Sequence, residues 1–139
     1  MVYMNKETFE IDSHLGTFDK DNCFEIDDVI VPTIQILNRK GYITVDCCAG
    51  HPFNTAGNGM YNSSISFKEG IVLPSLPPGY TLNNNIIRRF WDFELDFYAF
   101  VRDNIETMAQ LYKWALDLPA CEEVVYNPPK REYPPHWEN

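Results

Sequence analysis

The residues of this sequence best suited to chemistry lie together in the segment Asp46–Pro52, which reads DCCAGHP. Two thiols, a carboxylate and an imidazole follow one another there, directly after a β-branched stretch that favours a strand. Gly50 permits a backbone conformation that other residues avoid, and functional side chains often lie on such loops. This turn at the end of a strand is therefore the best candidate for a ligand-binding site. Its candidate residues are Asp46, Cys47, Cys48, Gly50 and His51.

The residues alone leave three interpretations of this turn open. One cysteine with His51 forms half of a zinc site, although no CxxC motif supplies the other half. A thiolate with His51 as its base would make a cysteine enzyme, but no known cysteine-hydrolase signature surrounds it. The third interpretation is structural, because neighbouring strand residues face opposite ways and only one cysteine would then lie in the core. We favour the structural interpretation and keep Cys47, Cys48 and His51 as candidate zinc ligands.

The doublet Arg88-Arg89 is the second candidate for ligand binding, and it lies in a predicted sheet region. On a strand only one of the two side chains can point to a given face. An arginine there can hold an anionic group through two parallel hydrogen bonds. We select Arg88 as the candidate, while a salt bridge to the acidic helix that follows is the simpler role. The aromatic residues nearby are expected in the core: Phe90, Trp91, Phe93, Phe97, Tyr98 and Phe100.

The charge balance limits the partners that this protein can have. The chain carries 20 acidic and 11 basic residues, a net charge of -9. Residues 1–28 hold eight of the acidic residues and only two of the basic ones. Nucleic-acid backbones and anionic membranes select clustered lysine and arginine, so both are disfavoured as partners. This charge fits a solvated surface, which is the simplest interpretation, or a basic protein partner or a metal.

The sequence shows neither a secretory signal peptide nor a membrane-spanning segment. The N-terminus has no basic region followed by an apolar run, and no apolar stretch reaches the length of a membrane span. We therefore expect a soluble, cytoplasmic protein whose four cysteines are reduced and form no disulfide framework.

The apolar spacing predicts two helices that must frame the turn. Apolar residues recur every three or four positions over 27–40 and 94–118. Asp27 or Asp28 is a suitable N-cap for the first helix, Pro32 lies in its first turn and Gly41 follows its end. The apolar face of the second helix consists of Phe97, Tyr98, Val101, Ile105, Met108, Leu111, Tyr112 and Ala115.

Strands are predicted where β-branched and aromatic residues alternate, at 42–48, 61–67, 71–73 and 85–92, with a short one at 8–11. The economical arrangement is an α+β fold of two layers, with two helices on one face of an antiparallel sheet of three or four strands. Its order is α-β-β-β-α, ending on the long helix. We expect one domain over 1–139, with an acidic N-terminal segment (1–25), an α+β body (26–118) and a tail rich in proline and aromatic residues (119–139).

Several short motifs resemble a family of small uncharacterised proteins of Gram-positive bacteria and their phages. They are GYIT at 41–44, CCAGH at 47–51, ISF at 65–67, LPPGY at 76–80, WA at 114–115 and LP at 118–119. The CCxGH turn is the most specific of them. The resemblance implies kinship over about residues 29–119, and no reaction goes with that family.

Three functions follow as hypotheses. The first, which we favour, is a non-enzymatic binding module for a protein partner or a small ligand, with a role in phage biology. The second is a metal-binding or cysteine-dependent enzyme centred on the turn. The third, a nucleic-acid-binding module, is suggested by the α-β-β-β-α order of double-stranded-RNA-binding domains. The acidic start of the second helix opposes it, because those domains grip phosphates with basic residues.

Overall fold

The computed structural model describes the chain except for residues 1, 6, 12–22, 51–60, 92–95 and 122–139. Its helices are α1 (Val31–Arg39) and α2 (Phe97–Asp117), and a 3₁₀ turn (Asp28–Ile30) precedes α1. Its strands are β1 (Val2–Asn5), β2 (Cys23–Ile26), β3 (Thr44–Cys48), β4 (Tyr61–Phe67), β5 (Thr81–Asn83) and β6 (Ile86–Trp91). Neither described helix has the length and apolar content that a membrane crossing needs.

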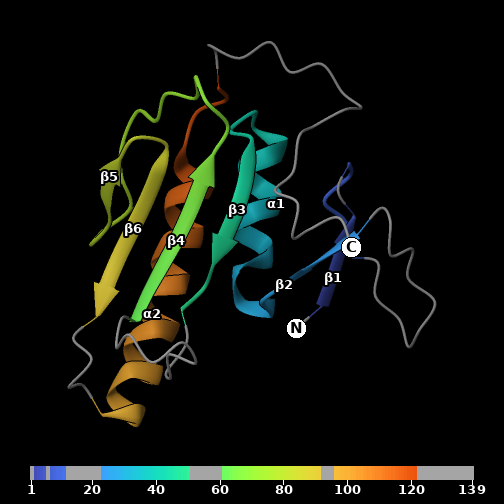
Figure 1. Cartoon of the computed structure of the whole chain (residues 1–139). Helices are drawn as coiled ribbons and strands as arrows, with labels where there is room; N and C mark the ends of the chain where they lie inside the picture. The colour runs from blue at the N-terminus through green and yellow to red at the C-terminus, as the bar shows by residue number, and fades with distance from the viewer. Residues whose placement is uncertain (1, 6, 12–22, 51–60, 92–95, 122–139) are drawn as a thin grey trace.

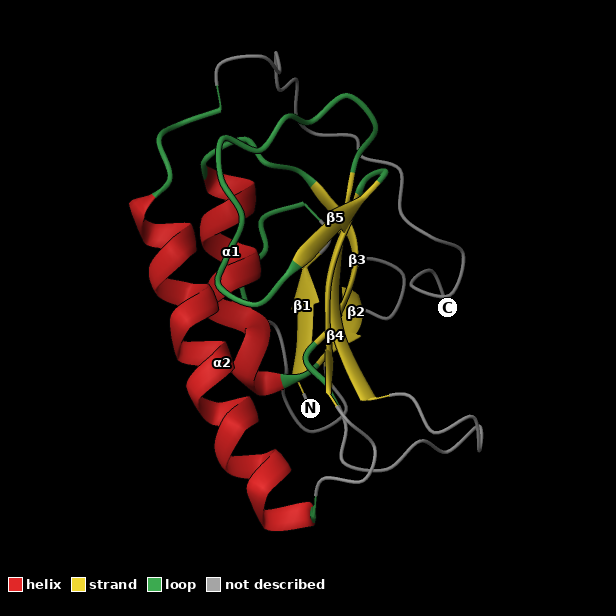
Figure 2. Cartoon of the chain, turned by 90° about the vertical axis from the view of Figure 1, so that its left-hand side faces the viewer, coloured by secondary structure: helices red, strands yellow, loops and turns green. Residues whose placement is uncertain are grey.

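The predicted α+β fold is confirmed. Four antiparallel strands form the main sheet in the order β3-β4-β6-β5, and both helices lie on one of its faces (Figures 1 and 2). A small second sheet, β1 with β2, was not predicted. It packs on α1, because Met4 and Phe24 join the same buried cluster as Ile34 and Leu37.

The strand predicted at 8–11 is wrong. The side chain of Asn5 accepts hydrogen bonds from the backbone N–H groups of Glu7 and Thr8, at 2.8 and 2.9 Å. This contact closes a tight turn, and Phe9 then has a φ of 59°, in which an extended strand cannot continue. Ile11 pairs with Met4 at a single bridge, and the true partner of β1 is β2.

The first helix begins later than predicted. Residues 28–30 form the 3₁₀ turn, and α1 begins at Val31 with Pro32 in its first turn. Of the two predicted N-caps, Asp28 lies within the turn. Asp27 occupies the N-cap position of the turn with an extended backbone, but its side chain makes no capping hydrogen bond. After the helix, Gly41 has a φ of 95°, which confirms its predicted place at the end.

The strand predicted at 71–73 is also wrong, and β5 takes its place. Asn84 and Asn85 form a two-residue turn that sets Asn83 opposite Ile86, and Asn84 has the positive φ that such a turn requires. The strand predicted at 85–92 is confirmed as β6, and the second helix as α2. Asp96 caps α2, since its carboxylate accepts from the N–H of Ala99 at 2.9 Å.

The register of the main sheet fixes which residues share a face. Cys47, Ile65 and Ile87 lie level on β3, β4 and β6, and Ile65 and Ile87 are fully buried against the helices. The residues one position along each strand therefore point to the other side, here called the outer face. Both described helices lie away from the outer face (Figure 2).

Candidate functional site

Cys47 and Cys48 lie on opposite faces of the main sheet. Cys47 is level with Ile65 and packs against the hydrophobic core, whereas Cys48 is level with Ser64 on the outer face. This confirms the expectation that only one of the two would join the core. Because the two side chains point apart, they cannot bind one metal ion together.

The surroundings of both thiols oppose ionisation. Burial, and then the carboxylates of Asp46 and Asp27, raise the pKa of Cys47 far above its usual value. Burial also raises the pKa of Cys48, a hydrogen bond from the Gly50 backbone opposes this, and Asp27 and Asp46 raise it further. A nucleophilic thiolate needs a nearby cation or base, and the charges found here are negative. Both groups are therefore protonated at neutral pH.

Gly50 lies at a tight junction between β3, β6 and α2. Its φ is 106°, and a Cβ atom there would lie 3.1 Å from Nδ2 of Asn104 and 3.3 Å from the ring of Trp91. Asn104 donates a hydrogen bond of 2.9 Å to the carbonyl of Ala49, and the N–H of Ala49 donates to Asp27 at 3.4 Å. The described part of the turn thus joins the strand to the helix layer.

His51 and Pro52 lie outside the described residues, so the role assigned to His51 stays a prediction. The same holds for zinc. Within the described ranges no group of three or more histidine, cysteine, aspartate or glutamate residues could hold a metal ion.

Four outer-face side chains form a row across the main sheet. Cys48 on β3 is level with Ser64 on β4, which is level with Arg88 on β6, which is level with Thr81 on β5. Direct neighbours in such a row have Cβ atoms about 5 Å apart. We call these four residues the outer-face row. Asp46, level with Ser66, lies two positions along the same face.

Three of the six predicted site residues thus share the outer face: Asp46, Cys48 and Arg88. Cys47 points into the core, and Gly50 lies at the junction beneath. Ser64 and Thr81 were missed by the sequence analysis. They become visible only through the strand pairing, because nothing local in the sequence links them to Cys48.

Arg88 carries an unsatisfied donor. Its Nε atom is buried and has no hydrogen-bond partner in the structure as described. Its guanidinium carbon lies 5.8 Å from the ring centroid of Phe90. Phe90 is 52% exposed on the outer face, so its predicted place in the core is wrong. The alternation along β6 explains this, because Arg88 and Phe90 share a face.

Arg89 points to the helix face and makes the predicted ion pair. Its guanidinium lies 3.0 Å from the carboxylate of Asp103 on α2. Trp91 Nε1 donates to the same carboxylate, and this bond, with Arg89, lowers the pKa of Asp103. The salt bridge expected for the doublet therefore involves Arg89, which leaves Arg88 to the outer face.

The other aromatic residues near the doublet divide between core and surface. Trp91 and Phe100 are buried and meet edge to face, with ring centroids 5.2 Å apart. Phe97 and Tyr98 are exposed, which contradicts their predicted burial. Phe93 lies outside the described residues.

Two hydrogen bonds in series connect Tyr80, through Ser63, to the backbone at the end of β3. Tyr80 donates to the hydroxyl of Ser63 at 2.8 Å, and Ser63 donates to the carbonyl of Cys48 at 3.0 Å. Burial raises the pKa of Tyr80. The segment that carries Tyr80 thereby fixes the strand end on which Cys48 lies.

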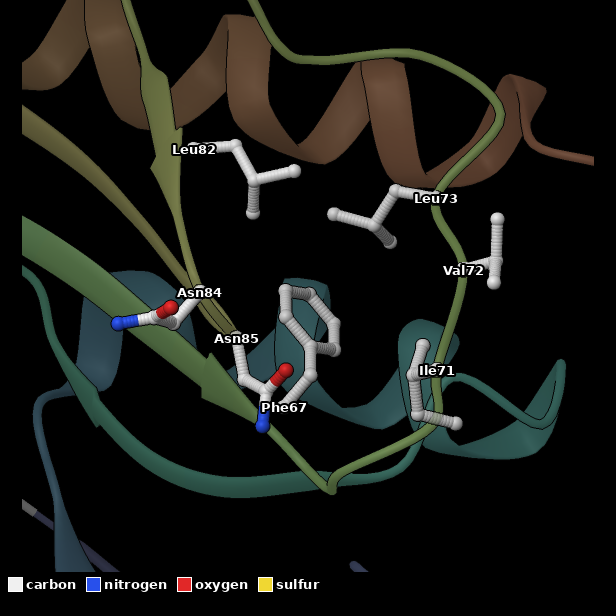
Figure 3. A pocket seen from close by; sticks show the side chains of 7 residues that line it. All are labelled: Phe67, Ile71, Val72, Leu73, Leu82, Asn84 and Asn85. Carbon is white, nitrogen blue, oxygen red and sulfur yellow. The ribbon is translucent and has the colours of Figure 1, made fainter.

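A small pocket opens elsewhere, between the β5–β6 turn and the loop after β4 (Figure 3). Its volume is about 220 Å³. Leu73 and Leu82 point toward the ring of Phe67, and the amides of Asn84 and Asn85 lie at one side. The pocket contains no charged side chain and none of the predicted site residues.

Comparisons of the chain with protein-family models, with curated proteins and with solved structures each gave no match.

Proposed function

We propose that this chain is a non-enzymatic binding module that holds the carboxylate or phosphate group of a small ligand at Arg88. The observation that carries the proposal is the buried, unpartnered Nε of Arg88 on the outer face. A guanidinium is charged at any accessible pH, and a buried charged donor without a partner costs free energy. An oxyanion bound at Nε and a terminal nitrogen would satisfy that donor in the bidentate geometry that arginine favours.

Phe90 gives the ligand a second feature. Its half-exposed ring lies beside the Arg88 guanidinium and offers a flat apolar surface. Ser64, level with Arg88 on β4, supplies a hydroxyl group that can donate to the same anion, whereas the Thr81 hydroxyl donates to the backbone carbonyl of Arg88 at 3.3 Å. The ligand class that fits is therefore an anionic group attached to a flat apolar body.

The raised pKa values of Cys47 and Cys48 favour binding over cysteine catalysis. Zinc binding through one cysteine and His51, binding to a basic protein surface, a cytoplasmic location and kinship with the phage-related family stay predictions. The proposed site depends on none of them.

The test is a calorimetric titration of the purified protein with phenyl phosphate, benzoate and inorganic phosphate. We expect phenyl phosphate or benzoate to bind more tightly than inorganic phosphate, because only the aromatic anions use Phe90. Arg88→Gln should weaken that binding at least tenfold, since a hydrogen bond to a charged group is worth about 1.5–3 kcal/mol.

Arg39→Gln is the matched control, because it removes the same charge from a surface ion pair with Glu10 on the helix side. It should leave the affinity unchanged. No heat of binding for any of the three probes, or equal affinities for the Arg88→Gln and unmodified proteins, would refute the proposal.

A further inference from the structure

Helix α2 carries apolar residues beyond the side that it buries against the core. Its buried side consists of Phe100, Thr107, Met108, Leu111, Trp114 and Ala115. Four residues of apolar character lie outside that side and are exposed by 82% (Tyr98), 62% (Ile105), 37% (Tyr112) and 44% (Leu116). We call these four residues the α2 stripe. The sequence pattern placed Tyr98, Ile105 and Tyr112 on the buried face of this helix, and that prediction is wrong.

The spacing of the α2 stripe is that of a helix-pairing seam. Tyr98, Ile105 and Tyr112 are seven residues apart, and Leu116 follows four residues later. A seven-residue apolar repeat keeps side chains on one line when two helices wind around each other. The stripe is about 27 Å long, from 1.5 Å per residue. Isolated exposed apolar residues need no explanation, but a continuous line of this length indicates an interface.

We infer that the α2 stripe packs against the same stripe of a second copy of this chain, with the two helices antiparallel and the two-fold axis near Ile105. In that arrangement Ile105 meets Ile105 of the second copy. Tyr98 lies level with Tyr112 of the second copy, and by symmetry Tyr112 lies level with Tyr98 of the second copy. A two-fold interface of this kind closes on itself and gives a dimer.

The charges beside the stripe select the antiparallel direction. Arg102 and Glu106 lie along the same flank of α2, one turn apart. In the antiparallel pair, Arg102 of each copy lies within half a turn of Glu106 of the other. In a parallel two-fold pair the two copies of this flank would lie on opposite sides of the interface, so that Arg102 and Glu106 would not meet. Opposite charges at such flanking positions favour the antiparallel pair.

The dimer does not depend on the anion site. The stripe is on the helix layer, and the outer-face row is on the other side of the sheet (Figure 2). A second copy seated on α2 would leave Arg88 accessible, so the two proposals can fail separately.

The first test is sedimentation equilibrium over a range of protein concentrations. We expect a monomer–dimer equilibrium, and we expect Ile105→Glu to give a monomer at every concentration. Val72→Glu is the matched control, because it places the same charge at a residue of similar exposure (54%) in the loop after β4. It should dimerise like the unmodified protein. A monomer at all concentrations for the unmodified protein, or a dimer that survives Ile105→Glu, overturns the inference.

The second test addresses the direction of the helices. Arg102→Glu alone and Glu106→Arg alone should each weaken dimerisation at least fivefold, because both place like charges opposite each other. An equimolar mixture of the two variants should form a heterodimer at the unmodified affinity, since opposite charges then meet at both contacts. Thermal unfolding of each variant checks that α2 remains folded. Folded single variants that dimerise like the unmodified protein would exclude the antiparallel arrangement.

Discussion

Cys47 and Cys48 are chemically identical neighbours that the strand places in different surroundings. The Cys47 thiol is packed with the core, and burial raises its pKa above the usual 9.0. The folded state therefore keeps the Cys47 proton at a pH at which the unfolded chain has lost it. The linked stability is complete below pH 9.0 and falls as the pH rises above it.

We predict that the free energy of unfolding falls above about pH 9 by up to about 1.4 kcal/mol per pH unit. Urea unfolding at several pH values measures this slope, and Cys47→Ala should reduce it, because the substitution removes the thiol that titrates. Cys48 contributes in the same direction, so Cys48→Ala is the comparison. An unchanged slope in Cys47→Ala would show that the thiol is not protected in the folded state.

Gly50 offers a test of the junction beneath the site. Gly50→Ala must accept both an unfavourable φ and a Cβ close to Asn104 and Trp91. Gly70→Ala is the control, because Gly70 has a similar φ of 94° but no atom within 4 Å of the added Cβ.

We expect Gly70→Ala to cost about 1 kcal/mol of unfolding free energy from the backbone alone, and Gly50→Ala to cost about 1–3 kcal/mol more from overpacking. Chemical denaturation of both variants gives the comparison. Equal losses would mean that Asn104 and Trp91 move aside freely and that the junction is not rigid.

At the scale of elements, α1 and α2 are joined by one lysine. Lys40, directly after α1, donates from Nζ to the carbonyls of Ala115, Leu116 and Leu118 at 2.5–2.9 Å. These are carbonyl groups at the C-terminal end of α2, where a helix carries partial negative charge. The ammonium group of Lys40, which is not part of α2, therefore caps the C-terminal end of that helix.

We predict that Lys40→Met lowers the unfolding free energy by about 1–2 kcal/mol, because it removes the cation and its hydrogen bonds to these carbonyls. Lys68→Met, at an exposed residue, is the control and should change stability by less than about 0.5 kcal/mol. Hydrogen exchange should also accelerate in the last turn of α2 in the Lys40→Met protein alone. Equal stability of the two variants would contradict the capping role.

The elements were predictable where the signal was local. The alternation of Ile86 to Trp91, the β-branched stretch before Cys47 and the apolar spacing of α2 each indicated the correct element. The sequence did not reveal the hairpin at Asn84, because β5 was not predicted and Asn85 was assigned to the strand at 85–92. Nor could it predict the β1–β2 pair, because that contact joins residues separated by a segment with no periodic pattern.

The candidate site was predictable only in part, for the same reason. Its residues Asp46, Cys48 and Arg88 were singled out by type, but their common face depends on the register of three strands. Phe90 shares the alternation of Arg88, yet its aromatic character suggested the core. The opposite placement of Cys47 followed directly from the two-residue period of a strand.

At the scale of the whole molecule, two surfaces remain uncovered by the described elements: the outer face of the main sheet and the α2 stripe. They lie on opposite sides and differ in chemistry, since one presents an arginine beside hydroxyl groups and the other tyrosines and aliphatic side chains. In a chain of net charge -9, an arginine whose buried Nε has no hydrogen-bond partner among the described residues is the more unusual of the two.

Chemical-shift mapping shows directly where on the protein an anion binds. Amide spectra of the ¹⁵N-labelled protein are recorded during a titration with phenyl phosphate. We predict that the largest shifts fall on Ser64, Thr81, Arg88 and Phe90, and that Arg88→Gln abolishes them. Largest shifts around Phe67 and Leu82, or along α2, would place the ligand elsewhere and contradict the proposed site.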